Sequence, residues 1–60
     1  EQIVLIEEEA EINGTKYMTG HSKNYIRCAF ESDGLVPNMV IKGTINSKLN
    51  EEFVFCKRID

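Results

Sequence analysis

Apolar and polar residues alternate along much of this chain, and short turn signals separate the alternating stretches. The alternation is clearest at residues 25–31, which read as a strand. Further strands are predicted at residues 2–7, 15–20, 39–47 and 53–59, so the pattern indicates an all-β chain of five strands. The strand at residues 25–31 is expected to place Ile26, Cys28 and Phe30 on one face, and Tyr25, Arg27, Ala29 and Glu31 on the other.

Turn residues indicate how these strands are connected. Asn13 and Gly14 both tolerate a positive φ, so this pair predicts a tight hairpin between the first two strands. Residues 32–34 and 48–52 predict two later turns. Gly43 lies inside the fourth predicted strand, where it indicates a bulge or a close approach of another group.

The length of the chain favours closure of the sheet. Sixty residues allow a single domain with a thin core, here residues 1–60. An open sheet of this size would leave two unpaired edges, whereas a barrel pairs every strand. We therefore expect a small five-stranded antiparallel closed barrel. Because the chain begins with Glu1 rather than Met, we also expect a domain cut from a longer polypeptide.

Composition argues against several classes of function. The longest aliphatic run, residues 3–6, is far shorter than the roughly 20 residues of a membrane helix, so we expect no membrane partner. Cys28 and Cys56 lack CxxC spacing and a His cluster, and we interpret them as reduced core thiols, with a disulfide between them as the alternative. No nucleophile–base pair or ligand cluster is evident, which predicts neither catalysis nor a bound metal.

Charge is sorted along the chain. The formal net charge of −3 taken alone argues against a nucleic-acid partner. However, the first twelve residues hold five acids and no base, whereas residues 13–30 and 34–50 hold bases and no acid. A folded barrel would then present a basic face and an acidic face. For binding of nucleic acid, a local basic surface matters more than the net charge of the chain. The bases of these two stretches are Lys16, Lys23, Arg27, Lys42 and Lys48.

One connection between strands carries chemistry that a turn does not need. His21 and Lys23 can contact phosphate, Asn24 can read a base edge, and Tyr25 offers a face for a base, a combination that suits single-stranded RNA. Arg27 would extend this patch onto the strand face that it shares with Tyr25. The full set of candidate RNA-binding residues is His21, Lys23, Asn24, Tyr25, Arg27, Lys16, Tyr17, Lys42 and Lys48.

Each candidate also has a structural interpretation. Tyr17 and Tyr25 are also consistent with half-buried barrel side chains, and Asn24 with a residue held at positive φ. Surface lysines commonly serve solubility alone. The sequence leaves these alternatives open.

The same segment resembles a known family. Together with residues 4–8, it is similar to the TRAM domain of radical-SAM tRNA methylthiotransferases, over nearly the whole chain. The similarity is greatest to the branch that modifies N6-threonylcarbamoyladenosine, whose TRAM domains typically show Gly-His-Thr-x-Asn-Tyr. The residues that carry the resemblance are Gly20, His21, Ser22, Lys23, Asn24 and Tyr25, with Ser22 in place of Thr. The last turn lacks the Gly that relatives often place there.

The resemblance implies a function for the domain. It implies an OB-like barrel at the carboxyl end of a larger enzyme, where it would bind tRNA and position the anticodon arm for methylthiolation. The parent enzyme would use 4Fe-4S clusters and S-adenosylmethionine. Cys28 and Cys56 do not match the CxxxCxxC triplet that holds such a cluster, so this domain is expected to be non-catalytic and to hold no cofactor.

The resemblance also implies partners. These are tRNA and the other domains of the parent enzyme. The interpretation of the cysteines as reduced thiols separately predicts a cytoplasmic location, and we expect the isolated domain to be a monomer. The rival hypothesis is an SH3-like interaction barrel that packs on the parent enzyme and never contacts RNA. The net charge of −3 favours this rival.

Overall fold

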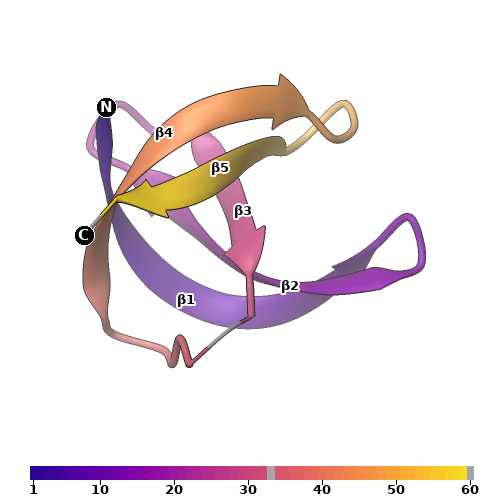
Figure 1. Cartoon of the computed structure of the whole chain (residues 1–60), viewed down its shortest axis with the longest axis horizontal. Coiled ribbons are helices and arrows are strands. Elements are labelled where there is room, and N and C mark those ends of the chain that lie inside the picture. The colour runs from indigo at the N-terminus through magenta and orange to yellow at the C-terminus, as the bar shows by residue number, and fades with distance from the viewer. Residues whose placement is uncertain (33, 60) are drawn as a thin grey trace.

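The computed structural model describes residues 1–32 and 34–59, which form five strands and no helix (Figure 1). The all-β prediction and the number of strands are therefore confirmed for this part of the chain. The molecule is compact, with extents of 25 × 21 × 18 Å. The strands are β1 (Gln2–Ile12), β2 (Thr15–Ser22), β3 (Arg27–Glu31), β4 (Val40–Lys48) and β5 (Val54–Ile59).

The strands close on themselves in the order β1-β2-β3-β5-β4, with β4 hydrogen-bonded back to β1. Four of the pairs are antiparallel, but β3 and β5 are parallel. The prediction of a wholly antiparallel arrangement is therefore wrong, and the reason is parity. Strand direction cannot alternate all the way around a ring of five, so at least one neighbouring pair must be parallel.

The predicted hairpin between β1 and β2 is confirmed. Asn13 and Gly14 have φ values of 53° and 82°, and the residues on either side of them, Ile12 and Thr15, are paired. β1 is longer than predicted, because the glutamate-rich residues 7–11 continue it instead of ending it. Pairing with β2 overrides their local helix propensity. A register shift at Glu7 bends the strand, and its curvature is evident in Figure 1.

Two details of the predicted strands are corrected. β3 begins at Arg27, and Tyr25 lies before it at a φ of 62°, so the two do not share a strand face. The bulge in β4 lies between Ile45 and Ser47 rather than at Gly43. Gly43 is instead a point of close approach, because a Cβ there would lie 2.5 Å from a ring carbon of Phe30.

Other turn predictions have mixed outcomes. The turn predicted at residues 32–34 includes Asp33, which lies outside the described residues. Gly34, beside it, has a φ of 75°. The segment that follows lies along β1, where the Asn38 amide donates to the Ile6 carbonyl and the Ile6 amide donates to the Met39 carbonyl. The last turn, at residues 49–53, separates β4 from β5 as expected.

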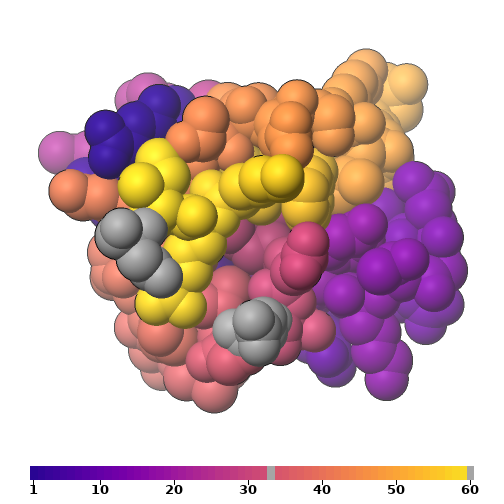
Figure 2. Space-filling view, in the orientation of Figure 1, coloured from indigo at the N-terminus to yellow at the C-terminus, as the bar shows by residue number. Residues whose placement is uncertain are grey.

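The core consists of two clusters on opposite sides of the strands. The second cluster explains why Ala29, predicted on the polar face of β3, is fully buried: the β4–β5 connection folds over it through Phe53. Figure 2 shows β5 in yellow and the β1–β2 hairpin in purple on the same face of the molecule. The inner cluster is Val4, Ile6, Met18, Cys28, Phe30, Leu35, Ile41 and Cys56, and the outer one is Ile12, Ala29 and Phe53.

Candidate nucleic-acid interface

The turn between β2 and β3 is organised by Ser22, which is buried. Its hydroxyl oxygen accepts hydrogen bonds from the amides of Asn24 at 3.3 Å and Ile26 at 3.2 Å. Its own amide donates to the Ile26 carbonyl at 2.9 Å, and its carbonyl accepts from the Tyr25 amide at 2.9 Å. Sequence reasoning treated Ser22 only as a replacement for Thr. The role of Ser22 could have been predicted from its position directly before a polar turn. Small hydroxyl side chains at such positions accept hydrogen bonds from backbone amides.

Tyr25 has a strained backbone and an exposed side chain. Its φ of 62° lies in the left-handed region, which costs a non-glycine residue about 1–2 kcal/mol. The side chain gains little burial in return, because the residue is 82% exposed. A bulky residue in this conformation is a genuine outlier, and strain of this kind is concentrated at functional sites. The half-buried alternative for Tyr25 is therefore wrong.

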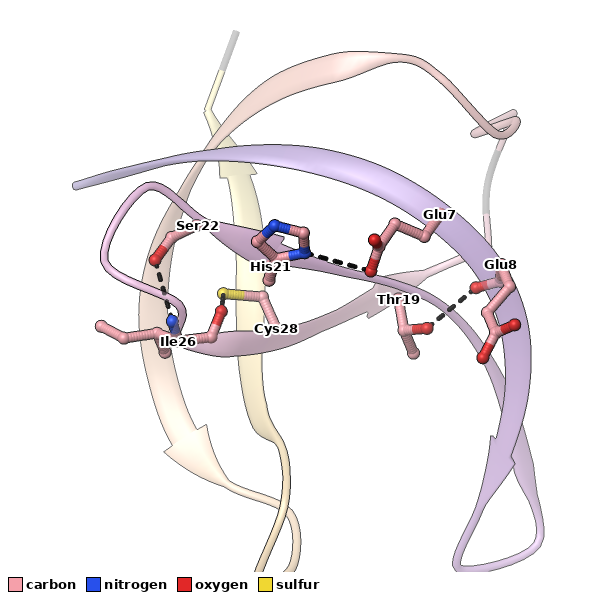
Figure 3. A network of polar contacts seen from close by, with 7 residues as sticks. All are labelled: Glu7, Glu8, Thr19, His21, Ser22, Ile26 and Cys28. Atoms are coloured by element: carbon pink, nitrogen blue, oxygen red, sulfur yellow. Dashed lines mark hydrogen bonds and ion pairs between the residues drawn. The ribbon is translucent and has the colours of Figure 1, made fainter.

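The exposed Tyr25 ring is stacked on His21. The two ring centroids lie 5.9 Å apart and the ring planes differ by 11°, an offset-stacked arrangement. His21 is in turn fixed by Glu7, whose carboxylate oxygen lies 3.2 Å from Nδ1 (Figure 3). Glu7 is the residue at the β1 bulge. This contact leaves the opposite ring nitrogen, Nε2, for a ligand.

Arg27 lies directly opposite His21 in the β2–β3 register. Its guanidinium carbon lies 4.8 Å from the centre of the Phe53 ring, and Nη1 lies 3.2 Å from a carboxylate oxygen of Glu52. The aromatic contact is favourable by about 0.5–1 kcal/mol at an exposed site. The β4–β5 connection thus holds the guanidinium over the outer face of β3.

The predicted candidates fall into two groups. His21, Tyr25 and Arg27 lie together, with exposed Lys23 and Asn24 in the same turn. We call these five residues the Tyr25 surface. The other candidates, Lys16, Tyr17, Lys42 and Lys48, do not belong to it.

The second group is dispersed over the molecule. Tyr17 lies at the far end of β2, where its ring contacts Phe55 edge to face at 5.9 Å, and Lys16 precedes it. Lys42 lies on β4 between β1 and β5, and Lys48 is 3.9 Å from Glu51. Sequence reasoning missed these acidic neighbours. Glu7, from the acidic stretch, lies beside His21, and the last turn places Glu52 beside Arg27 and Glu51 beside Lys48.

The two cysteines are free and buried in the inner cluster. Burial raises the pKa of Cys28, and burial together with the Cys28 thiol raises the pKa of Cys56 to about 12. Both thiols therefore stay protonated at neutral pH and are poor nucleophiles. Within residues 1–32 and 34–59, no three His, Cys, Asp or Glu side chains gather as metal ligands.

Comparisons of the chain with family models, curated proteins and solved structures give no significant match. The resemblance to TRAM domains therefore stays a hypothesis. The described residues contain no helix long and apolar enough to cross a membrane.

Proposed function

We propose that this domain binds single-stranded RNA through the Tyr25 surface. The observation that carries the proposal is the Tyr25 ring itself, which is strained at the backbone, 82% exposed and stacked on His21. One face of the phenol ring contacts the imidazole, and the other is open to a base. Stacking of a base on an aromatic side chain contributes about 1–3 kcal/mol and tolerates any base.

Charged and polar groups around this ring suit the phosphates and base edges. Lys23 and Arg27 supply positive charge, and Nε2 of His21 is directed away from Glu7. Glu52 offsets part of this charge, but an exposed ion pair is worth only about 0–1 kcal/mol. A phosphate group can replace the Glu52 carboxylate at small cost. Because the net charge is −3, we expect binding that is local and weak.

The strand arrangement supports an OB-like barrel. A five-stranded ring in the order β1-β2-β3-β5-β4 fits the Greek-key barrel of that fold, which binds oligonucleotides on the outer side of its second and third strands. His21 and Arg27 lie on these two strands.

Combined with the TRAM resemblance, this surface supports a more specific role. In this proposal the domain is a non-catalytic, tRNA-binding part of a larger methylthiotransferase. It holds the anticodon arm so that N6-threonylcarbamoyladenosine reaches the radical-SAM domain, which would supply the 4Fe-4S clusters and S-adenosylmethionine. The chain's own contribution is binding and orientation of the RNA.

Titration of the 60-residue chain with a tRNA anticodon stem-loop, at two or more ionic strengths, tests the proposal. With roughly three to five phosphate contacts, the logarithm of the binding constant should fall against the logarithm of salt concentration with a slope of about −2 to −3.5. Amide shifts should concentrate at residues 21–27. A blunt duplex of equal charge, which offers no unpaired base, should bind more weakly.

Three outcomes would count against RNA binding: no binding at millimolar protein, binding independent of salt, or shifts that avoid residues 21–27. The rival hypothesis, an interaction barrel, has its own supporting observation. Leu5 and Val40 are paired on the outer face of β1 and β4 and are 40% and 64% exposed, with Ile3 beside them at 54%. Exposed apolar patches are typical of protein contacts. That hypothesis predicts that the stem-loop leaves all amide shifts unchanged.

A further inference from the structure

The parallel contact between β3 and β5 is short. Only two residue pairs connect these strands, Cys28 with Val54 and Ala29 with Phe55. Beyond them β3 stays paired with β2, and β5 stays paired with β4. The two strands diverge toward their carboxyl ends, as Figure 1 shows. This divergence opens the ring on the face that is toward the viewer in Figure 2.

A cleft of about 410 Å³ lies where the strands separate, and we call it the seam cleft. Its lining includes the core side chains Phe30 and Cys56 and the ring of Phe55. Glu31, Lys57 and Arg58 also line it. Its volume lies within the range of about 300–1,000 Å³ that is typical of small-ligand sites.

A second hollow adjoins the seam cleft toward β2. The two hollows share Glu31 and Phe55, and the second one adds Lys16 and Tyr17. The Tyr17 and Phe55 rings contact each other edge to face, with an angle of 64° between their planes. Two aromatic residues and several bases thus border the adjoining hollows, and sequence reasoning did not place Phe55 or Lys57 in any site.

We propose that the seam cleft binds one nucleotide of single-stranded RNA, and the identity of this ligand rests on the proposed function. The base lies against the Phe55 ring, and its phosphate is contacted by Lys57 and Lys16. The Glu31 carboxylate only accepts hydrogen bonds, so it favours a base with an exocyclic amine. Adenine and cytosine present such a group and uracil does not.

The charges of the lining favour a nucleotide over the other occupant that this geometry admits. Separated strand edges can accept an extended peptide through backbone hydrogen bonds. Such a peptide needs neither cations nor a planar ring beside the opening. Apart from Arg58, the described lining of the two hollows holds two bases, Lys16 and Lys57, against the single acid Glu31. This excess of positive charge matches a phosphate group.

The Tyr25 surface and the second hollow, which adjoins the seam cleft, lie toward opposite ends of β2. His21 and Tyr17 are four residues apart on this strand, which corresponds to about 13 Å at about 3.3 Å per residue. A short single strand can span this distance. The two sites have no residue in common, so each can be tested separately.

The test is an amide-shift titration of the 60-residue chain with AMP, CMP, UMP and the uncharged nucleoside adenosine. We expect saturable shifts at Tyr17, Phe55 and Lys57. AMP and CMP should bind about three- to tenfold more tightly than UMP, the effect of one additional hydrogen bond. AMP should also bind more tightly than adenosine. Unchanged shifts at millimolar nucleotide, or equal affinities for all four ligands, would overturn the proposal.

Two exposed substitutions separate the proposed contacts. Lys57→Gln should lower the affinity for AMP toward that for adenosine, while leaving adenosine binding unchanged. Glu31→Ser should remove the preference of AMP over UMP. If both variants bind all ligands as the parent chain does, the assigned contacts are wrong. Thermal unfolding of each variant verifies that the fold is retained.

Failure of this inference is distinguishable from failure of the proposed function. If the stem-loop shifts residues 21–27 but nucleotides leave the seam cleft unchanged, only the seam cleft is disproved. If nucleotides shift Phe55 and Lys57 but the stem-loop does not perturb the Tyr25 surface, the proposed function fails. Shifts of the β3 and β5 amides with a short uncharged extended peptide, and not with nucleotides, would assign the cleft to peptide binding instead.

Discussion

The hydroxyl oxygen of Ser22 accepts a hydrogen bond from the amide of Ile26 at 3.2 Å, across the turn that presents Tyr25 (Figure 3). The same oxygen accepts from the Asn24 amide. One buried side chain thus satisfies two backbone donors of this turn. Tyr25 lies between these two donor residues and is held at positive φ. The conformation of the Tyr25 surface is therefore set from beneath by a residue that does not itself reach solvent.

Removal of this hydroxyl should destabilise the domain. Ser22→Ala leaves two amides without their acceptor, which should lower the free energy of unfolding by about 1–3 kcal/mol in urea denaturation. The matched control is Ser47→Ala, at an exposed position in β4, where we expect a change within about 0.5 kcal/mol. Equal effects of the two substitutions would show that Ser22 does not hold the turn.

Substitution of Tyr25 should separate binding from stability. Tyr25→Ala and Tyr25→Phe share the same backbone strain, so their difference reports the aromatic ring. The Ala variant should lose about 1–3 kcal/mol of stem-loop binding, whereas the Phe variant should retain it. Because the side chain is 82% exposed, the free energy of unfolding of both variants should lie within about 1.5 kcal/mol of the value for the parent. This margin allows for the loss of the ring contact with His21. Equal RNA affinity in the two variants would remove Tyr25 from the binding site.

Local patterns were sufficient for most of the fold. Asn13 and Gly14 predicted their hairpin because both residues tolerate positive φ, and alternation placed Cys28 and Phe30 inside. The same local reading failed at Ala29 and Tyr25. Ala29 is buried by Phe53 from a distant connection, which no pattern within β3 reveals. Tyr25 continued the alternation in sequence, but its hydrogen bond to the Ser22 carbonyl keeps it in the turn, and β3 begins only at Arg27.

The candidate surface was predictable only in part. His21, Lys23, Asn24 and Tyr25 are close in sequence, so any turn brings them near one another. Their acidic partners were not predictable, because Glu7 reaches His21 through the pairing of β1 with β2, and Glu52 reaches Arg27 from the connection between β4 and β5. The seam cleft depends on where β3 and β5 stop pairing, and this follows from closure of the whole ring rather than from either strand.

Two glycines should differ in their tolerance of a methyl group. A Cβ at Gly20 would collide with the backbone carbonyl of Leu5 on the paired strand, whereas a Cβ at Gly43 would mainly meet the side-chain ring of Phe30, with the Lys57 carbonyl oxygen at 3.1 Å. We expect Gly43→Ala to cost about 1–3 kcal/mol of stability, as overpacking does, and Gly20→Ala to cost more or prevent folding. Thermal unfolding measures both. The reverse order would mean that β1 and β2 adjust more readily than the core.

A third glycine variant serves as a control, because it measures the cost of backbone strain without steric overlap. Gly34→Ala places a methyl group in open space, but at a φ of 75°, so only backbone strain of about 1 kcal/mol should result. Because Gly20 is not at a positive φ, a cost at Gly34 as large as that at Gly20 would contradict the steric explanation.

The buried thiol of Cys56 should make the domain less stable in alkaline solution. Its pKa is raised from 9.0 to about 12 in the folded state, mainly by burial. Below pH 9 both states carry the proton, and the stabilisation is fully present. Between pH 9 and about 12 the unfolded chain releases this proton while the folded chain retains it, so stability falls by up to about 1.4 kcal/mol per pH unit.

Cys56→Ala provides the comparison. This variant should be less stable than the parent at neutral pH, because it leaves a small cavity in the inner cluster. Its stability should nevertheless fall less steeply above pH 9, because the variant lacks the Cys56 thiol whose proton the folded parent retains. Urea denaturation at several alkaline pH values gives the two slopes. Parallel curves would show that the Cys56 thiol ionises as readily in the folded chain as in the unfolded one.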